Sequence, residues 1–257
     1  MNQISAAVSA TFLELYSRLN IFSNPTLLLS SDSKVLRWVG GLRSPQKLPL
    51  PPPIPPNTRT ATLVFHGAGG PDSFTKELME RLENDSPDDS YSHFYDWSDY
   101  STNLFKAAFN AQTVGEHVGR TLTSPPSSLH IIGISVGSFA ADSCLKTLRT
   151  LHPTSTLQLT LLDPFTQRGV LGVGYGVKYF GREADYAQQF LNTDDPVPST
   201  NEACKECAVF DVTGAREREE EIFGHDWPLV YFSRYWGDVG IVEEARRIGR
   251  GEVIKVP

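Results

Sequence analysis

The segment Leu129-His130-Ile131-Ile132-Gly133-Ile134-Ser135-Val136-Gly137-Ser138-Phe139-Ala140-Ala141 decides the fold. Its first half is an apolar run that predicts a buried strand, and its second half is typical of a helix. Between them lies the pattern Gly-x-Ser-x-Gly, with Ser135 at its centre. Glycines at both ends allow a sharp turn and a close strand–helix contact, while the serine takes a strained conformation that exposes its hydroxyl. The pattern alone is weak, but this context predicts a nucleophile elbow at Ser135.

A second glycine-rich turn, Thr62-Leu63-Val64-Phe65-His66-Gly67-Ala68-Gly69-Gly70, follows a short β-prone run. A loop of this kind after an early strand supplies backbone N–H groups to a developing oxyanion. We expect Ala68 N–H and Val136 N–H to be the two donors. Two other interpretations are a simple tight turn and a phosphate-binding loop, but the glycines lack the GxGxxG spacing of a dinucleotide site.

A serine hydroxyl becomes a good nucleophile only when a neighbouring base removes its proton. In folds with this elbow, the acid and the histidine follow the serine in the order Ser, Asp or Glu, His. Of the six histidines only His152 and His225 follow Ser135. His152 comes too soon, directly after the elbow helix, whereas His225 follows the β-like run 207–212 and a charged loop. Chain order therefore favours His225 as the base over an ordinary surface histidine.

Two aspartates lie at plausible strand ends and are candidates for the acid. Asp163 closes the alternating run 157–162, and Asp195 comes at the end of the next candidate strand. Each is followed by a proline, which ends a strand and leaves the carboxylate at the rim of the sheet. Either carboxylate would orient the imidazole and stabilise the imidazolium without taking the proton itself. The other aspartate would then be a turn or capping residue.

Several segments together resemble a known family. They are Tyr95-Asp96-Trp97-Ser98, then Ala107, Asn110 and Val114-Gly115, and then the strand and elbow from His130 to Gly137. These segments are similar to those of the pancreatic-lipase branch of the α/β-hydrolases. Leu162-Asp163-Pro164 resembles the segment that carries the acid of that branch, which favours Asp163. Asp194-Asp195-Pro196-Val197-Pro198 resembles the acid segment of fungal lipases, so Asp195 stays the alternative.

The resemblance implies hydrolysis of a carboxylic ester by Ser135, Asp163 and His225, without a cofactor. The substrate would be a small-molecule or lipid ester with an apolar acyl part. Acyl transfer and amide cleavage at the same site are alternatives, and so is a binding protein with a silent triad. An intact serine, histidine and two acids argue against the silent site.

The fold that we predict is an α/β-hydrolase, with a mainly parallel sheet flanked by helices. Its catalytic domain spans residues 58–257, after an N-terminal extension 1–57 that ends in the proline-rich connector 48–56. The expected strands cover residues 62–65, 92–95, 129–134, 157–162, 188–192 and 208–212. The glycine-rich segment 169–181 is expected to be an acyl-binding or lid element, or a connection over one sheet edge.

Composition limits the partners. The chain has 23 basic and 30 acidic residues and a net charge of −7, so it has no excess of positive charge with which to bind a nucleic-acid backbone. No apolar run approaches the roughly 18 residues of a membrane span. Residues 4–19 lack a positive n-region and include Glu14, so no secretory signal is predicted. We expect a soluble, cytoplasmic protein with at most transient contact with a lipid surface.

Three cysteines do not make a disulfide framework. Cys204 and Cys207 form one CxxC pair, which needs a second pair or histidines to hold zinc. His225 is the nearest downstream histidine and is already the expected base. We therefore predict no metal site, a local disulfide or two plain thiols at Cys204 and Cys207, and a core position for Cys144.

Overall fold

The computed structural model describes residues 48–257 apart from 86, 103, 170–171, 219–221 and 236–245. The described strands form one parallel sheet in the order β2-β1-β3-β4-β5-β6-β7. The strands are β1 (Thr60–Phe65), β2 (Ser90–Tyr95), β3 (Ser128–Ile134), β4 (Thr156–Leu162), β5 (Tyr186–Leu191), β6 (Ala208–Asp211) and β7 (Val253–Lys255). The predicted α/β class with a mainly parallel sheet is confirmed, and six of these strands coincide with predicted ones. The seventh, β7, was not predicted.

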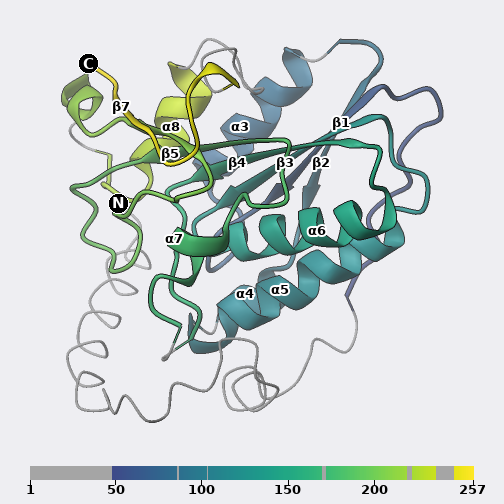
Figure 1. Ribbon diagram of the computed structural model, residues 1–257, viewed down its shortest axis with the longest axis horizontal. Coiled ribbons are helices and arrows are strands. Elements are labelled where there is room, and N and C mark those ends of the chain that lie inside the picture. Colours follow the sequence, from purple (N-terminus) through teal and green to yellow (C-terminus); the bar gives the residue numbers. More distant parts are fainter. Residues whose placement is uncertain (1–47, 86, 103, 170–171, 219–221, 236–245) are drawn as a thin grey trace.

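Helices cover both faces of the sheet (Figure 1). On one face lie α5 (Leu104–Thr121) and α6 (Gly137–Leu151), with the short α4 (Ser98–Ser101) and α7 (Tyr175–Tyr179). On the other face lie α3 (Ser73–Asn84) and α8 (Trp227–Arg234). A 3₁₀ helix, η3 (Gly214–Arg218), follows β6. The result is a three-layer α/β/α arrangement.

Two hydrophobic cores separate the sheet from its helices, because successive residues of a strand point to opposite faces. In β3, Leu129 and Ile131 belong to the core under α5 and α6. Ile132 and Ile134 belong to the core under α3 and α8. A strand buried on both faces has a continuous apolar sequence, which is why β3 could be predicted from the sequence.

Two glycines bring α6 close to the sheet. A Cβ added at Gly133 would lie 2.6 Å from Ser138 Cα, and one at Gly137 would lie 2.4 Å from His66 O. Both separations are shorter than any real contact of a Cβ atom, so only glycine permits this packing. Only two residues therefore lie between the end of β3 and helix α6, which begins beside the loop that follows β1.

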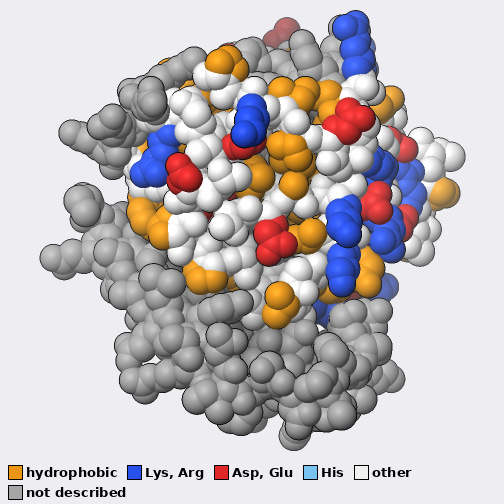
Figure 2. Space-filling view, turned by 60° about the vertical axis from the view of Figure 1, so that its left-hand side comes forward, with side chains coloured by type: hydrophobic (Ala, Val, Ile, Leu, Met, Phe, Trp, Pro, Cys, Tyr) orange, Lys and Arg blue, Asp and Glu red, His pale blue; other side chains and the backbone are white. Residues whose placement is uncertain are grey.

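Residues 1–47 of the expected N-terminal extension lie outside the described residues. In the described connector, Leu48 and Ile54 pack against the core under α5 and α6, and the Tyr95 hydroxyl donates to Pro49 O at 2.5 Å. None of the helices that the structure describes is long and apolar enough to cross a membrane. Figure 2 shows that basic and acidic side chains lie interspersed among apolar ones on the described part of one face.

Candidate active site

Ser135 lies at the junction of β3 and α6, with a φ of 51°. This left-handed conformation is unfavourable for a residue with a side chain, and it persists only where the surroundings hold it. Here Ser135 N–H donates to Leu162 O at 3.0 Å, and Ser135 O accepts from Ser138 N–H and Phe165 N–H at 3.1 Å each. The turn is thus fixed from both neighbouring elements, and the serine side chain stays partly exposed.

His225 lies in the turn that leads into α8. The turn is closed by a hydrogen bond from Asp226 N–H to Phe223 O at 2.9 Å, and it is held to β5 by Asn192 Nδ2, which donates to Gly224 O at 2.8 Å. The imidazole is 18% exposed, and its Nε2 lies 2.8 Å from Ser135 Oγ. Ser135 and His225 are therefore within hydrogen-bond distance, 90 residues apart in the sequence.

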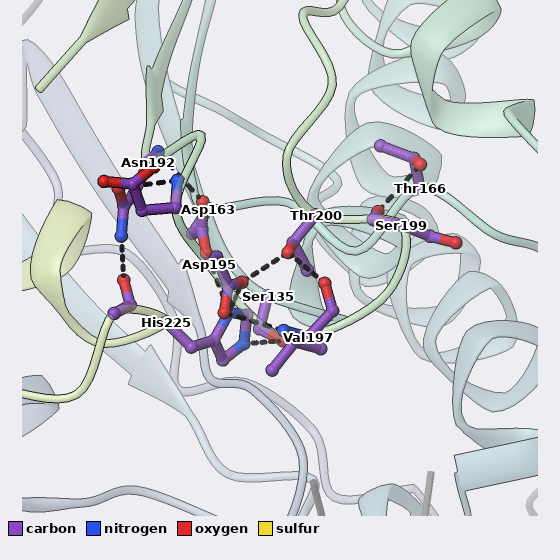
Figure 3. Close-up of polar contacts among 11 residues, drawn as sticks. Ser135, Asp163, Thr166, Asn192, Asp195, Val197, Ser199, Thr200 and His225 are labelled. Carbon is purple, nitrogen blue, oxygen red and sulfur yellow. Dashed lines mark hydrogen bonds and ion pairs between the residues drawn. The ribbon is translucent and has the colours of Figure 1, made fainter. Parts of the chain in front are cut away.

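Both candidate acids contact the same ring nitrogen (Figure 3). Asp163 Oδ2 and Asp195 Oδ2 each lie 2.8 Å from His225 Nδ1. Asp163 follows β4 with a φ of 45°, and its Oδ1 accepts from Asn192 N–H at 3.3 Å. Asp195 accepts from Val197 N–H at 2.9 Å on Oδ1 and from the Thr200 hydroxyl on Oδ2. The sequence offered the two aspartates as alternatives, and the structure brings both to the histidine.

The two carboxyl groups differ in their electrostatics. Burial raises the pKa of Asp163 well above its ordinary value. Burial acts in the same direction on Asp195, but hydrogen bonds and the charge of His225 outweigh it and lower the pKa of Asp195 to about 2. Burial by itself lowers the pKa of His225, whereas the two neighbouring carboxyl groups raise this pKa well above its ordinary value.

The loop after β1 lies against the serine. A Cβ added at Gly67 would lie 3.2 Å from Ser135 Cβ. The buried His66 ring shapes this loop, because its Nε2 accepts from Trp97 N–H at 3.0 Å and its Nδ1 lies 2.7 Å from Gly67 O. Since Nε2 accepts, the proton of the neutral ring lies on Nδ1, which donates to Gly67 O. Burial lowers the pKa of His66, in keeping with a neutral ring.

Of the two expected oxyanion donors, Val136 follows Ser135 in the chain, and Ala68 follows Gly67, which lies against Ser135. In a trans peptide the C=O and N–H groups point in opposite directions, so Ala68 N–H points away from the His66 ring that holds Gly67 O. Val136 N–H belongs to the residue that caps α6. Within the described residues, neither N–H donates a hydrogen bond to another protein group. Neither N–H is therefore occupied by an acceptor among the described residues, as the expected role requires.

Asp163, Asp195 and His225 each place one possible ligand atom for a metal ion within 4.8 Å of the others. A bound zinc ion would replace the hydrogen bonds of Nδ1, because it takes the nitrogen lone pair at about 2.0–2.1 Å. The observed separations of 2.8 Å are those of charge-assisted hydrogen bonds.

Cys204 and Cys207 are buried free thiols, and so is Cys144, whose predicted core position is confirmed.

Two hollows of the described surface lie away from Ser135. One, of about 460 Å³, lies between α3 and β2, and the other, of about 670 Å³, lies against α5, α6 and α7. The segment expected to be a lid or acyl-binding element includes α7; Tyr175 of this helix and Phe180, directly after it, pack against Phe139 of α6. Sequence reasoning missed Asn192 and Thr200, which hold the two carboxylates, because no local pattern links them to the aspartates.

No protein-family model matches the chain, and no curated protein is similar to it in sequence. Among solved structures, it is similar to a presumed hydrolase of the alpha/beta superfamily from Xanthomonas campestris pv. campestris, at 20% identity over 54% of this chain and 73% of that chain, with a TM-score of 0.37. It is also similar to Aspergillus fumigatus lipase B, at 12% identity over 55% of this chain and 39% of that chain, with a TM-score of 0.38. The parallel sheet flanked by helices, with a strained serine between β3 and α6, is an α/β-hydrolase-like fold.

Proposed function

We propose that this protein hydrolyses carboxylic esters, with Ser135 as the nucleophile and His225 as its general base. The observation that carries the proposal is the separation of 2.8 Å between Ser135 Oγ and His225 Nε2, with carboxylates on the opposite ring nitrogen. A serine hydroxyl needs such a base, and the base needs a third group that orients it. The positive φ of Ser135 supports the same role, because backbone strain of this kind clusters at functional sites.

The reaction proceeds by acyl transfer through the serine. Ser135 Oγ attacks the ester carbonyl while its proton passes to His225 Nε2. Asp163, or Asp195 in its place, stabilises the imidazolium, and the N–H groups of Ala68 and Val136 hold the oxyanion. His225 then protonates the departing alcohol. A water molecule, activated by the same histidine, cleaves the acyl-serine and regenerates the free hydroxyl.

An uncharged, apolar ester is the substrate class that we propose. Asp163, Asp195 and Asp226 surround His225, and the whole chain carries a net charge of −7. This field repels an anionic ester and leaves a neutral one unaffected. The resemblance of the elbow and of the Asp163 segment to the pancreatic-lipase branch supports a lipid-like substrate. Acyl transfer to an alcohol at the same site would give the same intermediate and a different product.

The test is hydrolysis of p-nitrophenyl esters with short and long acyl chains. We expect Ser135→Ala and His225→Ala to reduce kcat/KM by at least about 1,000-fold. Ser127→Ala, which removes an exposed hydroxyl just before β3, is the matched control and should retain full activity. Product analysis in the presence of an added alcohol separates hydrolysis from acyl transfer. Activity that survives Ser135→Ala would overturn the proposal.

A further inference from the structure

His225 Nδ1 faces two acids although it carries only one hydrogen. Both Asp163 Oδ2 and Asp195 Oδ2 lie 2.8 Å from this nitrogen (Figure 3). The two carboxyl side chains are almost completely buried, with exposed fractions of 2% and 0%. Two carboxylates that share one buried site rarely both ionise, because their repulsion raises the proton affinity of one of them. The arrangement therefore accommodates one more proton than a single-acid site does.

The hydrogen bonds indicate which of the two acids keeps its charge. The negative charge of Asp195 is stabilised by more hydrogen bonds, because Val197 N–H and the Thr200 hydroxyl both donate to its carboxylate. Asp163 receives one backbone N–H, from Asn192, at 3.3 Å on Oδ1. That bond marks Oδ1 as the carbonyl-type oxygen of Asp163 and leaves Oδ2, on the side of Asp195 and His225, to carry a proton.

We propose that Asp163 and Asp195 act as a single acid that holds one proton and one negative charge between them. Asp163 Oδ2–H donates to Asp195, and the Asp195 carboxylate accepts His225 Nδ1–H. When Ser135 attacks an ester, its proton moves to His225 Nε2, and the proton of the aspartate pair stays where it is. The inference rests on the proposed Ser135–His225 pair and deepens it by assigning Asp163 as a positioning residue.

Other charged groups around this cluster are few within the described residues. Asp226 follows His225 in the chain and interacts electrostatically with His225, Asp72 and Asp195. The Arg216 guanidinium approaches the same turn, since its Nη1 would lie 3.3 Å from a Cβ at Gly224. None of these side chains makes a hydrogen bond with the two acids in the described structure. The aspartate pair therefore sets the charge opposite Nδ1.

A shared proton predicts an unusual pattern of substitution effects. Asp163→Asn replaces a neutral donor by a neutral amide donor and keeps the charge of Asp195. Asp195→Asn removes the repulsion, so Asp163 loses its proton and takes over the charge. Each single substitution therefore preserves one carboxylate opposite the histidine, and only the double substitution removes it. The pair should behave non-additively, as groups that act as a unit do.

The experiment compares wild type, Asp163→Asn, Asp195→Asn and the double variant, with the exposed neighbour Asp194→Asn as the control. Two quantities are measured: the titration of His225 by NMR in the resting protein, and kcat/KM for a p-nitrophenyl ester. We expect the titration midpoint to move by less than about 0.5 pH units in Asp163→Asn and to fall by at least about 1.5 in the double variant. We expect less than about a 30-fold loss of kcat/KM in each single variant and at least about a 1,000-fold loss in the double variant.

Either of two patterns would overturn the shared proton. If one single variant matched the double variant, a single aspartate would be the acid; if the two single effects were equal and additive, both would be independently charged. Infrared difference spectroscopy gives a second readout, because the wild-type-minus-variant spectrum at neutral pH should contain a protonated-carboxyl band for Asp163→Asn and also for Asp195→Asn. Absence of that band from either difference spectrum would equally reject the proposal. The NMR and infrared measurements need no turnover, so they stand even if the ester-hydrolase proposal fails.

Discussion

Gly137→Ala adds one methyl group where α6 meets the end of β1. The added Cβ would lie 2.4 Å from His66 O and 2.5 Å from Phe65 O, about 1 Å inside ordinary contact. Both neighbours are backbone oxygens, so neither can rotate away as a flexible side chain could. The substitution must therefore displace either the start of α6, with Ser135, or the loop after β1, with Ala68.

Two opposing effects set the magnitude for Gly137→Ala. Alanine favours a helix interior over glycine by about 1 kcal/mol, and at the first residue of α6 this gain is at most that, so alone it would stabilise the variant. Overpacking of a close contact costs typically about 1–3 kcal/mol, and rigid backbone neighbours place this site at the upper end. The net expectation is a destabilisation of about 2 kcal/mol, or a Tm lower by about 4–8 °C for a domain of this size. If Ala68 N–H is displaced from its proposed role as an oxyanion donor, kcat should also fall, by up to about 100-fold.

Thermal unfolding followed by circular dichroism measures the first effect, and ester hydrolysis by the same samples measures the second. Gly214→Ala is the matched control, because a Cβ there would meet only Val256 O, at 3.4 Å, an ordinary contact. It should leave Tm and kcat almost unchanged. If Gly137→Ala were as stable and as active as wild type, helix propensity would outweigh the contact, and the close packing of the elbow against β1 would be refuted.

The titration of His225, the buried His66 ring and the contact between α3 and α8 are each open to a direct test. His225 must be neutral to act as a base, and its carboxyl neighbours raise its pKa. In a pH–rate profile, kcat/KM should therefore rise with pH to a midpoint above the ordinary histidine value of about 6.5. A midpoint below that value would contradict this. His66→Phe keeps the stacking on Trp97, whose ring centroid lies 5.2 Å away, but removes both hydrogen bonds of the His66 ring. In steady-state kinetics kcat should fall by about 10–100-fold with little change in KM. An unchanged kcat would show that His66 does not position the loop after β1. The Arg234–Glu77 ion pair joins α8 to α3 through contacts of 2.6 and 2.7 Å, but each side chain is about one-third exposed. A double-mutant cycle of urea unfolding should therefore give a coupling free energy of at most about 1 kcal/mol. A coupling near 3 kcal/mol would show that solvent screens the pair less than its exposure indicates.

The sequence predicted the parts of the fold that depend on local pattern. The run at 129–134 is apolar because β3 is buried on both faces, and the glycines at 133 and 137 are required by the close approach of α6. The exposed β7 escaped prediction for the opposite reason. It is three residues long, and Val253 and Ile254 are 47% and 40% exposed, so it carries no burial pattern.

Residue type and chain order were sufficient to predict which residues could form the candidate site. Chain order selected His225, and proline-terminated strands selected Asp163 and Asp195. Whether one or both aspartates reach the histidine depends on the packing of the loops after β4 and β5, which brings residues 32 apart in the chain to the same nitrogen. Such contacts across loops leave no periodic trace in a sequence, and neither do the hydrogen bonds that Asn192 and Thr200 donate.

The central claim is that Ser135 is a nucleophile activated by His225. Reaction with an alkyl fluorophosphonate, followed by mass spectrometry of the digested protein, tests it most directly, because attack by the serine oxygen displaces fluoride and leaves a stable phosphonyl ester. We predict one equivalent of label, on Ser135, formed at least about 100-fold more slowly in His225→Ala. A folded wild-type protein that takes up no label, or that is labelled at another residue, would contradict the account.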